Sequence, residues 1–388
     1  MSAAKGLPLS GVRVVDFTHH AAGPMCTMLL GDYGAEIIKI EPPEGEAFRT
    51  SGTVRVGGEH VGFLALNRSK KSVVLDLKTP DGKQAVLDII ARSHGVVENF
   101  RPGTMERLGL GYEQLLGINP YLVYCALSAF GPDGPYRDKQ GLDVVLQAMS
   151  GLMSITGEPD RGPLPAGAPV ADISSGVFGA LGVVLAIMQA RQSGKPQRVD
   201  IAMLDCMVAI CNLRYQQMLA TGEDMPRLGA AHPQASPWDV YHASDAPFVI
   251  AATRDEYWRQ MCEGLGIPQH AHDPQFATIK ARVANRVQVN ALLNELFRGN
   301  TRAHWLALLD RAQVPNGPVN SLPDVVADAQ MRASETFISV RNVDGKALPT
   351  VDSPIRINGR RGARQGVPAL GEHTEAVLSE FGISMKKP

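Results

Sequence analysis

The chain of 388 residues is long enough to bury a complete core, and its length suggests two domains. Its 38 Lys and Arg residues nearly balance its 39 Asp and Glu residues, so no net field draws it to nucleic acid or to an anionic membrane. Its five cysteines form no CxxC pair, which predicts reduced, buried thiols of a cytosolic protein and no metal site.

Short β-branched runs alternate with helical stretches through the first half of the chain. This alternation predicts an α/β domain whose parallel sheet is wound by right-handed crossovers. We expect strands at 12–17, 35–40, 72–77, 95–99, 121–128 and 197–202. We expect helices at 22–31, 80–92, 143–154, 173–192 and 204–219, and a further helix that starts near residue 104.

The composition changes near residue 221, where several Gly, Pro and Ala residues with little periodicity predict a connector. A smaller region follows, with amphipathic helices near 255–265, 285–297 and 302–312. The tail contains alternating segments at 337–343 and 355–358. We therefore predict a large domain at 1–220, a linker at 221–237, a small α+β domain at 238–331, and a C-terminal segment at 332–388 that returns to the large domain.

The sequence has no feature of a secretory signal or of a membrane span. Its N-terminus carries a lysine without an apolar core, and the most apolar run, 177–188, is shorter than the roughly 20 residues needed to cross a bilayer. We therefore expect a soluble, cytoplasmic protein.

Asp172 lies where a loop rich in Gly and Pro turns into a long apolar helix, in the stretch GAPVADISSG at 167–176. The positive end of a helix dipole would keep this carboxylate ionised and fixed in direction, so it could act as a nucleophile. The alternative is an N-cap that only satisfies backbone donors, because Asp is favoured at that position.

Basic side chains gather near the ends of two predicted strands. In a doubly wound sheet the carboxyl ends of the strands line the ligand crevice, and the helix near Thr104 would offer free N–H groups to a phosphate. Together these features predict a polyphosphate ligand. The basic residues are Arg68, Lys70, Lys71, Lys78, Arg101 and Arg107.

Several common motifs are absent from the sequence. It contains no GxSxG elbow, no GxxxxGK[ST] loop, and no GxGxxG at 31–34, which disfavours a serine hydrolase, a P-loop protein and a nicotinamide enzyme. His19 and His20 are adjacent on an extended backbone and point to opposite sides, so we expect one of them to be structural. The HAHD stretch at 270–273 is expected to be an exposed loop rather than a metal site.

Six short segments, in order between residues 9 and 210, are weak singly but specific as a set. They are LSGVRVVDF at 9–17, GAEIIKIE at 34–41, LDLK at 75–78, VENFRPG at 97–103, QAMSG at 147–151 and the Asp172 segment. This set resembles the class III CoA-transferase family, also called CaiB/BaiF. The residues RLG at 227–229 and Pro237–Trp238 in the connector are similar to that family as well.

The resemblance implies a homodimer of interlocked ring-like chains, each with a Rossmann-like large domain and a smaller domain. It also implies that Asp172 attacks an acyl-CoA thioester, forms a mixed anhydride, and then carries CoA as an aspartyl thioester. A carboxylate suits this role because its ordinary pKa near 4 leaves it charged at pH 7. The implied partners are an acyl-CoA and a small carboxylic acid, with no tightly bound cofactor, metal, nucleic acid or membrane.

The resemblance also assigns contacts to coenzyme A, some around the nucleotide and diphosphate and others beside the thioester. Ala21 stands where formyl-CoA transferases carry a glutamine, and only Gly229–Ala231 stands where they have a glycine-rich flap, so a formyl or oxalyl substrate is not expected. The residues assigned to coenzyme A are Ala21, Ala22, Leu75, Asp76, Leu77, Lys78, Asn99, Phe100, Arg101, Arg107, Gln140 and Leu142.

Two other functions remain open. A 2-methylacyl-CoA racemase needs a His in a Gly-His-Asp triplet, where this chain has Gly141–Leu142–Asp143, and leucine cannot carry a proton. Asp143 itself could orient the acyl group or cap its own helix. The second alternative is a CoA-binding protein without turnover, and the intact Asp172 segment argues against it.

Overall fold

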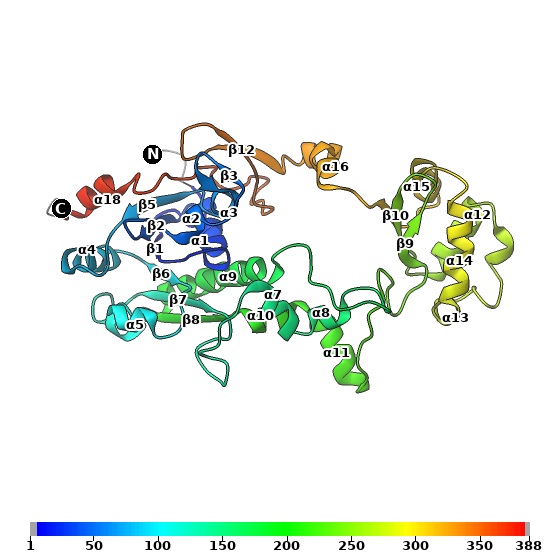
Figure 1. Ribbon diagram of the computed structural model, residues 1–388, viewed down its shortest axis with the longest axis horizontal. Helices are drawn as coiled ribbons and strands as arrows, with labels where there is room; N and C mark the ends of the chain where they lie inside the picture. Colours follow the sequence, from blue (N-terminus) through cyan, green and yellow to red (C-terminus); the bar gives the residue numbers. More distant parts are fainter. Residues whose placement is uncertain (1–5, 385–388) are drawn as a thin grey trace. The chain divides into compact units, whose positions relative to one another are not determined.

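The computed structural model describes residues 6–384, which divide into two compact units (Figure 1). Unit 1 comprises the chain up to Leu152, Pro165–Gly222 and the chain from Gln330 onward, and unit 2 comprises Met153–Leu164 and Glu223–Ala329. No feature of the sequence separates Met153–Leu164 from the large domain. This segment packs in unit 2, where the Gly229 N–H donates to the Gly157 carbonyl at 3.0 Å.

Unit 1 contains the expected parallel sheet, in the order β5-β2-β1-β6-β7-β8. The chain moves outward from β1 in one direction and then outward from β6 in the other, so the switch point of the topology lies between β1 and β6. The strands are β1 Arg13–Asp16, β2 Glu36–Glu41, β5 Lys70–Val74, β6 Gly95–Glu98, β7 Val123–Ser128 and β8 Gln197–Ala202. Two hairpins stand apart from this sheet, β3 Arg55–Val56 with β4 Glu59–His60, and β12 Phe337–Arg341 with β13 Ala347–Val351.

The helices of unit 1 agree with the alternation in the sequence, although some expected helices are divided. The expected helix 143–154 is broken at Gly151, whose φ of +76° suits glycine, and the expected helix 204–219 is broken at Cys211. The helices are α1 Ala22–Asp32, α2 Ala47–Thr50, α3 Val61–Leu66, α4 Pro80–Ile90, α5 Thr104–Leu108, α6 Tyr112–Leu116, α7 Asp143–Met149, α9 Val170–Ser193, α10 Met203–Ile210, α11 Asn212–Thr221 and α18 Thr374–Phe381, while α8 Leu152–Ile155 and α17 Ala329–Ala333 cross the unit boundaries.

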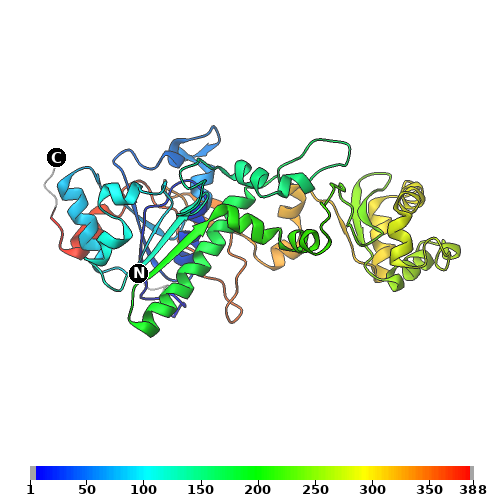
Figure 2. The ribbon, with the colours of Figure 1, turned by 90° about the horizontal axis from the view of Figure 1, so that it is seen from below.

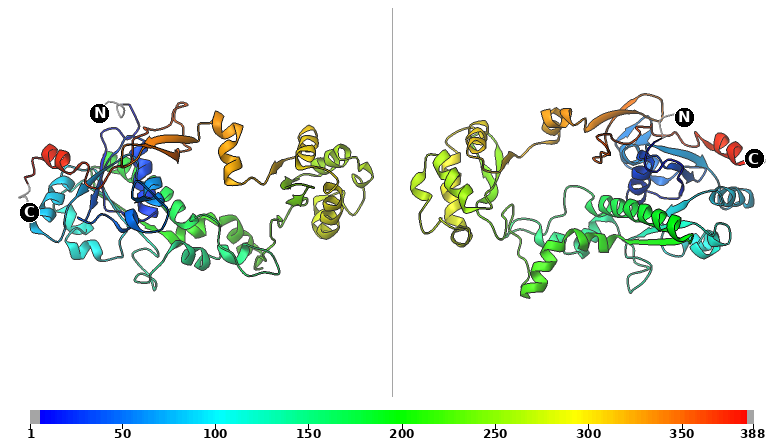
Figure 3. Two further views of the ribbon diagram at one scale, coloured as in Figure 1. Left: turned by 45° about the horizontal axis from the view of Figure 1, so that its top comes forward. Right: turned by 180° about the vertical axis from the view of Figure 1, so that it is seen from behind.

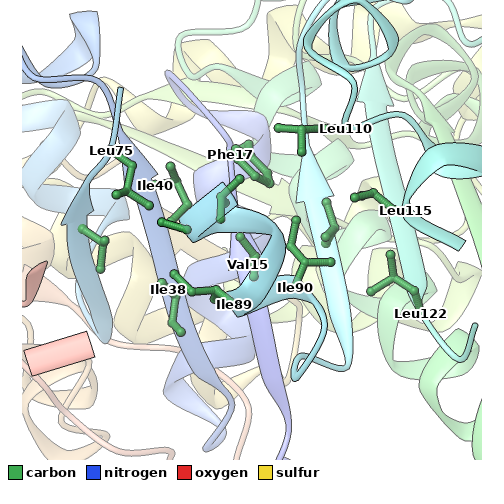
Figure 4. Close-up of a cluster of buried hydrophobic side chains, with 14 of the residues drawn as sticks. Val15, Phe17, Ile38, Ile40, Leu75, Ile89, Ile90, Leu110, Leu115 and Leu122 are labelled. Carbon is green, nitrogen blue, oxygen red and sulfur yellow. The ribbon is translucent and has the colours of Figure 1, made fainter. Parts of the chain in front are cut away.

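Successive strand residues point to opposite faces of the sheet, and helices cover both faces. Val14 and Ile37 pack with residues of α1 and α9 on one face. Val15 and Ile38 pack on the other face with Ile89 of α4 and with neighbouring apolar side chains (Figure 4). Both faces of the central strands are therefore buried, as is usual for parallel sheets.

The tail of the chain packs against unit 1, within which α18 contacts β5 and α4. The Thr374 hydroxyl accepts from the Val74 N–H at 3.0 Å, and the Phe381 carbonyl accepts from Arg92 at 2.6 Å. The alternating segment at 355–358 forms no strand, and a single bridge between Ile357 and Arg360 is all that forms there.

Unit 2 is an α+β unit with a three-stranded antiparallel sheet in the order β11-β10-β9 (Figure 2). Tyr241, Phe248 and Trp258 contribute to its core. Arg282 is fully buried and donates to the Ser236 carbonyl at 2.6 Å. The elements are β9 Trp238–His242, β10 Pro247–Ala251, β11 Asn316–Pro318, α12 Asp255–Gly264, α13 Ile279–Ala284, α14 Arg286–Phe297, α15 Arg302–Arg311 and α16 Leu322–Ala327, with a 3-10 turn at Pro268–His270.

The long helix α9 runs beside β7 and β8 (Figure 3). It extends from residue 170 to residue 193, close to the expected 173–192. By length and composition alone it could cross a membrane, a test that the core helix of a soluble protein also passes, and it is the one such helix among residues 6–384. All five cysteines are free and buried, as expected.

Candidate active site

The loops that follow β1 and β6 lie side by side at the carboxyl edge of the sheet, on the two sides of the switch point. The His19 N–H donates to the Asn99 side-chain oxygen at 2.8 Å, and the Asn99 amide donates back to the His19 carbonyl at 2.9 Å. The His19 ring meets the edge of Phe100 at a centroid distance of 5.1 Å. Ligand crevices of open α/β sheets form at this place, so these loops mark the candidate site.

Asp172 lies in the first turn of α9, and the following turn of α9 packs directly on the first turn of α1. A Cβ atom built on Gly176 would lie 2.7 Å from the Ala22 carbonyl oxygen and 2.6 Å from the Met25 Cβ, so only glycine allows the two helices to approach so closely. Ala22 and Ala171 also share a small apolar cluster. The start of α9 therefore lies beside the start of α1, which follows the loop that contains Ala21.

The N-cap interpretation of Asp172 is wrong, because Pro169 is the N-cap of α9 and Asp172 is the third residue of the helix. The N–H groups of Ala171 and Asp172 instead donate to the Asp143 carboxylate, at 2.7 Å and 3.1 Å. Within residues 6–384, the Asp172 carboxylate itself has no hydrogen-bond partner. It is therefore held near a helix N-terminus without being bonded to it.

The charge state of Asp172 follows from these surroundings. Burial, and then the charge of Asp143, raise the pKa of Asp172 to about 6. The ordinary pKa near 4 that the sequence suggested therefore does not apply. A pKa of about 6 still leaves roughly 90% of the carboxylate ionised at pH 7.

Asp143 is the first residue of α7, and its side chain accepts hydrogen bonds from the start of α9 and from Gln147, one turn further along α7. Gln147, which is 1% exposed, donates to the second Asp143 oxygen at 2.6 Å. The Gln147 side-chain oxygen Oε1 accepts from the Ala166 N–H at 2.8 Å. The N-cap of α7 is Leu142, so the alternative that Asp143 caps its own helix is wrong.

Four fully buried charges support the loop after β1, and their pairing was not predicted from the sequence. Lys39 pairs with Glu46 at 2.8 Å, and Lys70 pairs with Asp16 at 3.1 Å. Although burial opposes ionisation, the charges of Lys70 and Lys39 outweigh it and lower the pKa of Asp16 to about 2. The one sequence signal was a lysine inside the apolar strand β2.

This quartet, Asp16, Lys39, Glu46 and Lys70, holds the backbone of the loop as well. Lys39 donates to the Thr18 carbonyl at 2.6 Å, and the His20 N–H donates to Glu46 at 3.0 Å. His20 has a φ of +62°, which is uncommon for a residue with a side chain. The buried charges thus fix the loop that leads to Ala21 and α1.

The predicted basic cluster is divided by the structure. Arg68 is buried against Asp32 and Lys70 against Asp16, so the prediction that these two side chains bind phosphate is wrong, and Lys71 pairs with Glu36. The other three, Lys78, Arg101 and Arg107, are exposed after β5 and β6. The helix near Thr104 is the five-residue α5.

The residues assigned to coenzyme A follow the carboxyl ends of strands or precede α7. Leu75 is 1% exposed, so its side chain belongs to the core and only its backbone could meet a ligand. Leu142 is 72% exposed. After β5 lie Leu75, Asp76, Leu77 and Lys78, after β6 lie Asn99, Phe100, Arg101 and Arg107, between β1 and α1 lies Ala21, at the start of α1 lies Ala22, and before α7 lie Gln140 and Leu142.

The remaining histidines give no sign of a metal centre. His19 is half-buried on Phe100 and His20 is exposed, so one of the pair is tied into the fold. In the 270–273 stretch Ala271 is buried, while His272 is exposed. Residues 6–384 contain no group of three His, Cys, Asp or Glu side chains placed to hold a metal ion.

Known proteins match this chain over nearly its whole length. A family model described as "CoA-transferase family III" matches residues 9–374. A succinate–glutarate CoA-transferase of Agrobacterium fabrum is 38% identical, with 96% of each chain covered. An acetyl-CoA:oxalate CoA-transferase of Acetobacter aceti is 36% identical, with 98% of this chain and 97% of the relative covered. The crystal structure of a CaiB/BaiF family protein from Brucella suis superposes with a TM-score of 0.88 at 37% identity, with 97% of this chain and 99% of that chain covered.

Proposed function

This chain belongs to CoA-transferase family III, and we propose that it moves coenzyme A from an acyl-CoA to a free carboxylic acid through covalent intermediates on Asp172. One observation carries the proposal. The half-buried Asp172 carboxylate lies in the first turn of α9 against the start of α1, without a hydrogen bond to any of residues 6–384. An ionised carboxylate that is partly desolvated and not hydrogen-bonded is a competent nucleophile.

The reaction then proceeds by two exchanges at carbonyl carbons. An Asp172 oxygen attacks the thioester carbonyl, the C–S bond breaks, and a mixed anhydride and CoA thiolate result. The thiolate attacks the aspartyl carbonyl, the anhydride C–O bond breaks, and the first acid leaves as its carboxylate. The acceptor acid reverses both steps, so the enzyme ends with a free carboxylate and a new acyl-CoA. No net proton, oxidant or nucleotide is consumed.

We propose further that the acids are dicarboxylic. The support is the naming of relatives, since the transferases of Agrobacterium fabrum and Acetobacter aceti are named for succinate, glutarate and oxalate. Ala21 and the short Gly229–Ala231 segment set this chain apart from formyl-CoA transferases. We therefore place succinate and glutarate before oxalate as substrates.

A homodimer is part of the proposal. One face of α9 is buried in unit 1, while Leu181, Leu185 and Met188 on another face are 53%, 56% and 54% exposed. On α11, Leu213 is 83% exposed. Apolar surface of this kind usually marks an interface, so we propose that a second copy covers it in a cytoplasmic protein that binds neither a membrane nor nucleic acid.

Intact-mass spectrometry tests the covalent step. Incubation with succinyl-CoA should add the mass of coenzyme A, less one water, to the protein, and hydroxylamine should remove it. Asp172→Ala should lose the adduct and the transfer activity while it still binds coenzyme A in calorimetry. An adduct of equal yield on Asp172→Ala would refute the proposal.

The racemase alternative is separated by one further assay. With a 2-methylacyl-CoA in D₂O and no acceptor acid, a racemase exchanges the α-proton for deuterium, while the proposed transferase does not. Leu142, which stands in the triplet where the racemase needs a histidine, supports the transferase.

A further inference from the structure

We propose that Asp143 is a positioning residue that keeps the Asp172 carboxylate free for attack by occupying the first N–H groups of α9 in its place. The inference rests on the proposed function and adds to it a second residue and the reason for that residue's charge. It is carried by hydrogen bonds that link α7, the loop before α9, and α9 itself.

The first turn of a helix leaves its N–H groups without helical partners. An aspartate in that turn can accept such groups itself, which stabilises its charged form and weakens it as a nucleophile. In this chain the Ala171 and Asp172 N–H groups already donate to one oxygen of Asp143, at 2.7 Å and 3.1 Å. The Asp172 side chain is therefore left without these donors.

Gln147 holds the Asp143 side chain in place. It lies one turn after Asp143 on α7, is buried, and uses both ends of its amide: the NH₂ group donates to Asp143 at 2.6 Å, and the oxygen accepts from Ala166 at 2.8 Å. The residues on both sides of the loop 167–169 are thus bonded to α7, Ala166 before the loop and Ala171 and Asp172 after it. This arrangement fixes the direction in which Asp172 leaves its helix.

Asp143 also acts on Asp172 by its charge. α9 packs against α1, α7, α10, β7 and β8. Among the ionisable groups on these elements, it is the Asp143 charge that acts on Asp172, and together with burial it raises the pKa of Asp172. The ionisable side chains there are Cys26 and Asp32 on α1, Asp143 on α7, Asp205 and Cys206 on α10, Tyr124 and Cys125 on β7, and Arg198 and Asp200 on β8.

The charge has a consequence for the reaction. When Asp172 forms an anhydride or a thioester it loses its negative charge, so its repulsion by Asp143 ends. The like charge therefore raises the free energy of the resting carboxylate but not that of the covalent intermediates. Asp143 should favour formation of the intermediates by the same factor by which it lowers the acid dissociation constant of Asp172.

The main variant is Asp143→Asn, which removes the charge and keeps an acceptor oxygen for the α9 N–H groups, while its NH₂ group cannot accept from Gln147. Burial is the first cause and the Asp143 charge the second of the rise in the pKa of Asp172 from 3.8 to about 6. We therefore expect the acid limb of the kcat/KM profile to move to lower pH. The yield of the covalent CoA adduct should fall, by about tenfold for each pH unit by which the limb moves.

Two further variants separate positioning from charge and from general damage. Asp205→Asn removes an exposed carboxylate of α10 and should leave the acid limb where it is in the wild type. Gln147→Met removes both amide bonds, and we expect kcat to fall while the KM for the acyl-CoA stays within about twofold.

The outcomes distinguish this inference from the proposed function. If Asp172→Ala abolishes the adduct but Asp143→Asn keeps the wild-type acid limb, the role of the Asp143 charge is wrong and the nucleophile stands. If Asp172→Ala keeps the adduct, the proposed function fails. Should Asp143→Asn not fold, an unchanged kcat in Gln147→Met, or a KM that rises in proportion to the fall of kcat, would refute the positioning role.

Discussion

The substitution Lys39→Met tests how much the buried quartet that supports the loop after β1 contributes to stability. The Lys39 side chain is 0% exposed, pairs with Glu46 at 2.8 Å, and donates to the Thr18 carbonyl at 2.6 Å. Methionine fills a similar volume without the charge, so Glu46 and Asp16 would share the single cation Lys70. Removing one partner of a buried ion pair leaves a buried charge uncompensated, at a cost of about 3–5 kcal/mol in the free energy of unfolding.

The pH dependence gives a second measure. The pKa of Asp16 is depressed to about 2, so its contribution to stability, about 2 kcal/mol, is present above pH 3.8 and is lost as the pH falls through 2. Lys39→Met removes one of the two cations that depress this pKa. We therefore expect Asp16 to take up its proton at a higher pH, and the wild type and the variant to differ less at pH 4 than at pH 7.

Urea unfolding followed by far-UV circular dichroism measures the effect. The three tryptophans, Trp238, Trp258 and Trp305, all lie in unit 2, so their fluorescence serves as an internal reference for the unit that is not altered. Lys71→Met is the matched control, because the Lys71 side chain is 27% exposed, pairs with Glu36 near the surface, and should cost at most about 1 kcal/mol. Equal losses in the two variants would refute the reasoning.

Three further predictions concern packing and titration. Gly176→Ala should lower stability by about 1–3 kcal/mol and reduce activity, because its Cβ would lie 2.7 Å from the Ala22 carbonyl oxygen; Gly167→Ala, with no atom within 4 Å, should melt like the wild type in calorimetry. Burial raises the pKa of Glu98 to about 7, so its ionisation costs stability as the pH rises from 4.5 through 7; Glu98→Gln should be more stable at pH 8 by about 3 kcal/mol, and parallel stability curves would contradict this. Arg282→Met should lower the tryptophan-monitored transition of unit 2 by about 2–4 kcal/mol and leave the CD transition of unit 1 in place, since it strands the buried carbonyls of Ser236 and Phe276.

The parts of the fold that depend on local pattern could be predicted from the sequence. β-branched runs alternate with helical stretches along the chain, and the apolar residues in each follow the period of a strand or a helix. The six strands of the parallel sheet lie within a few residues of their expected positions. Breaks inside helices were missed at Gly151 and Cys211, because a left-handed glycine or a change of helix direction leaves the apolar pattern almost unaltered.

The ionic part of the site could not be predicted, because the partners of a charge are set by the fold. Arg68 and Lys70 stand close to Lys78 in the sequence, and all three seemed equally suited to phosphate. Arg68 and Lys70, however, occupy the start of β5 and its approach, where Asp32 and Asp16 bury them, whereas Lys78 follows the end of β5 and stays exposed. The end of a strand, rather than the number of basic residues, decides whether a lysine can reach a ligand.

Asp143 and Asp172 illustrate the same limit at the reacting atoms. The sequence allowed each of them to cap the N-terminus of its own helix. Both predictions were wrong, because Asp143 caps α9, the helix to which Asp172 belongs. Capping preferences state that an acceptor is needed at a helix N-terminus but not which side chain provides it. When the cap comes from another helix, an aspartate in the first turn does not have to accept the N–H groups of its own helix. Its carboxylate is then available as a nucleophile.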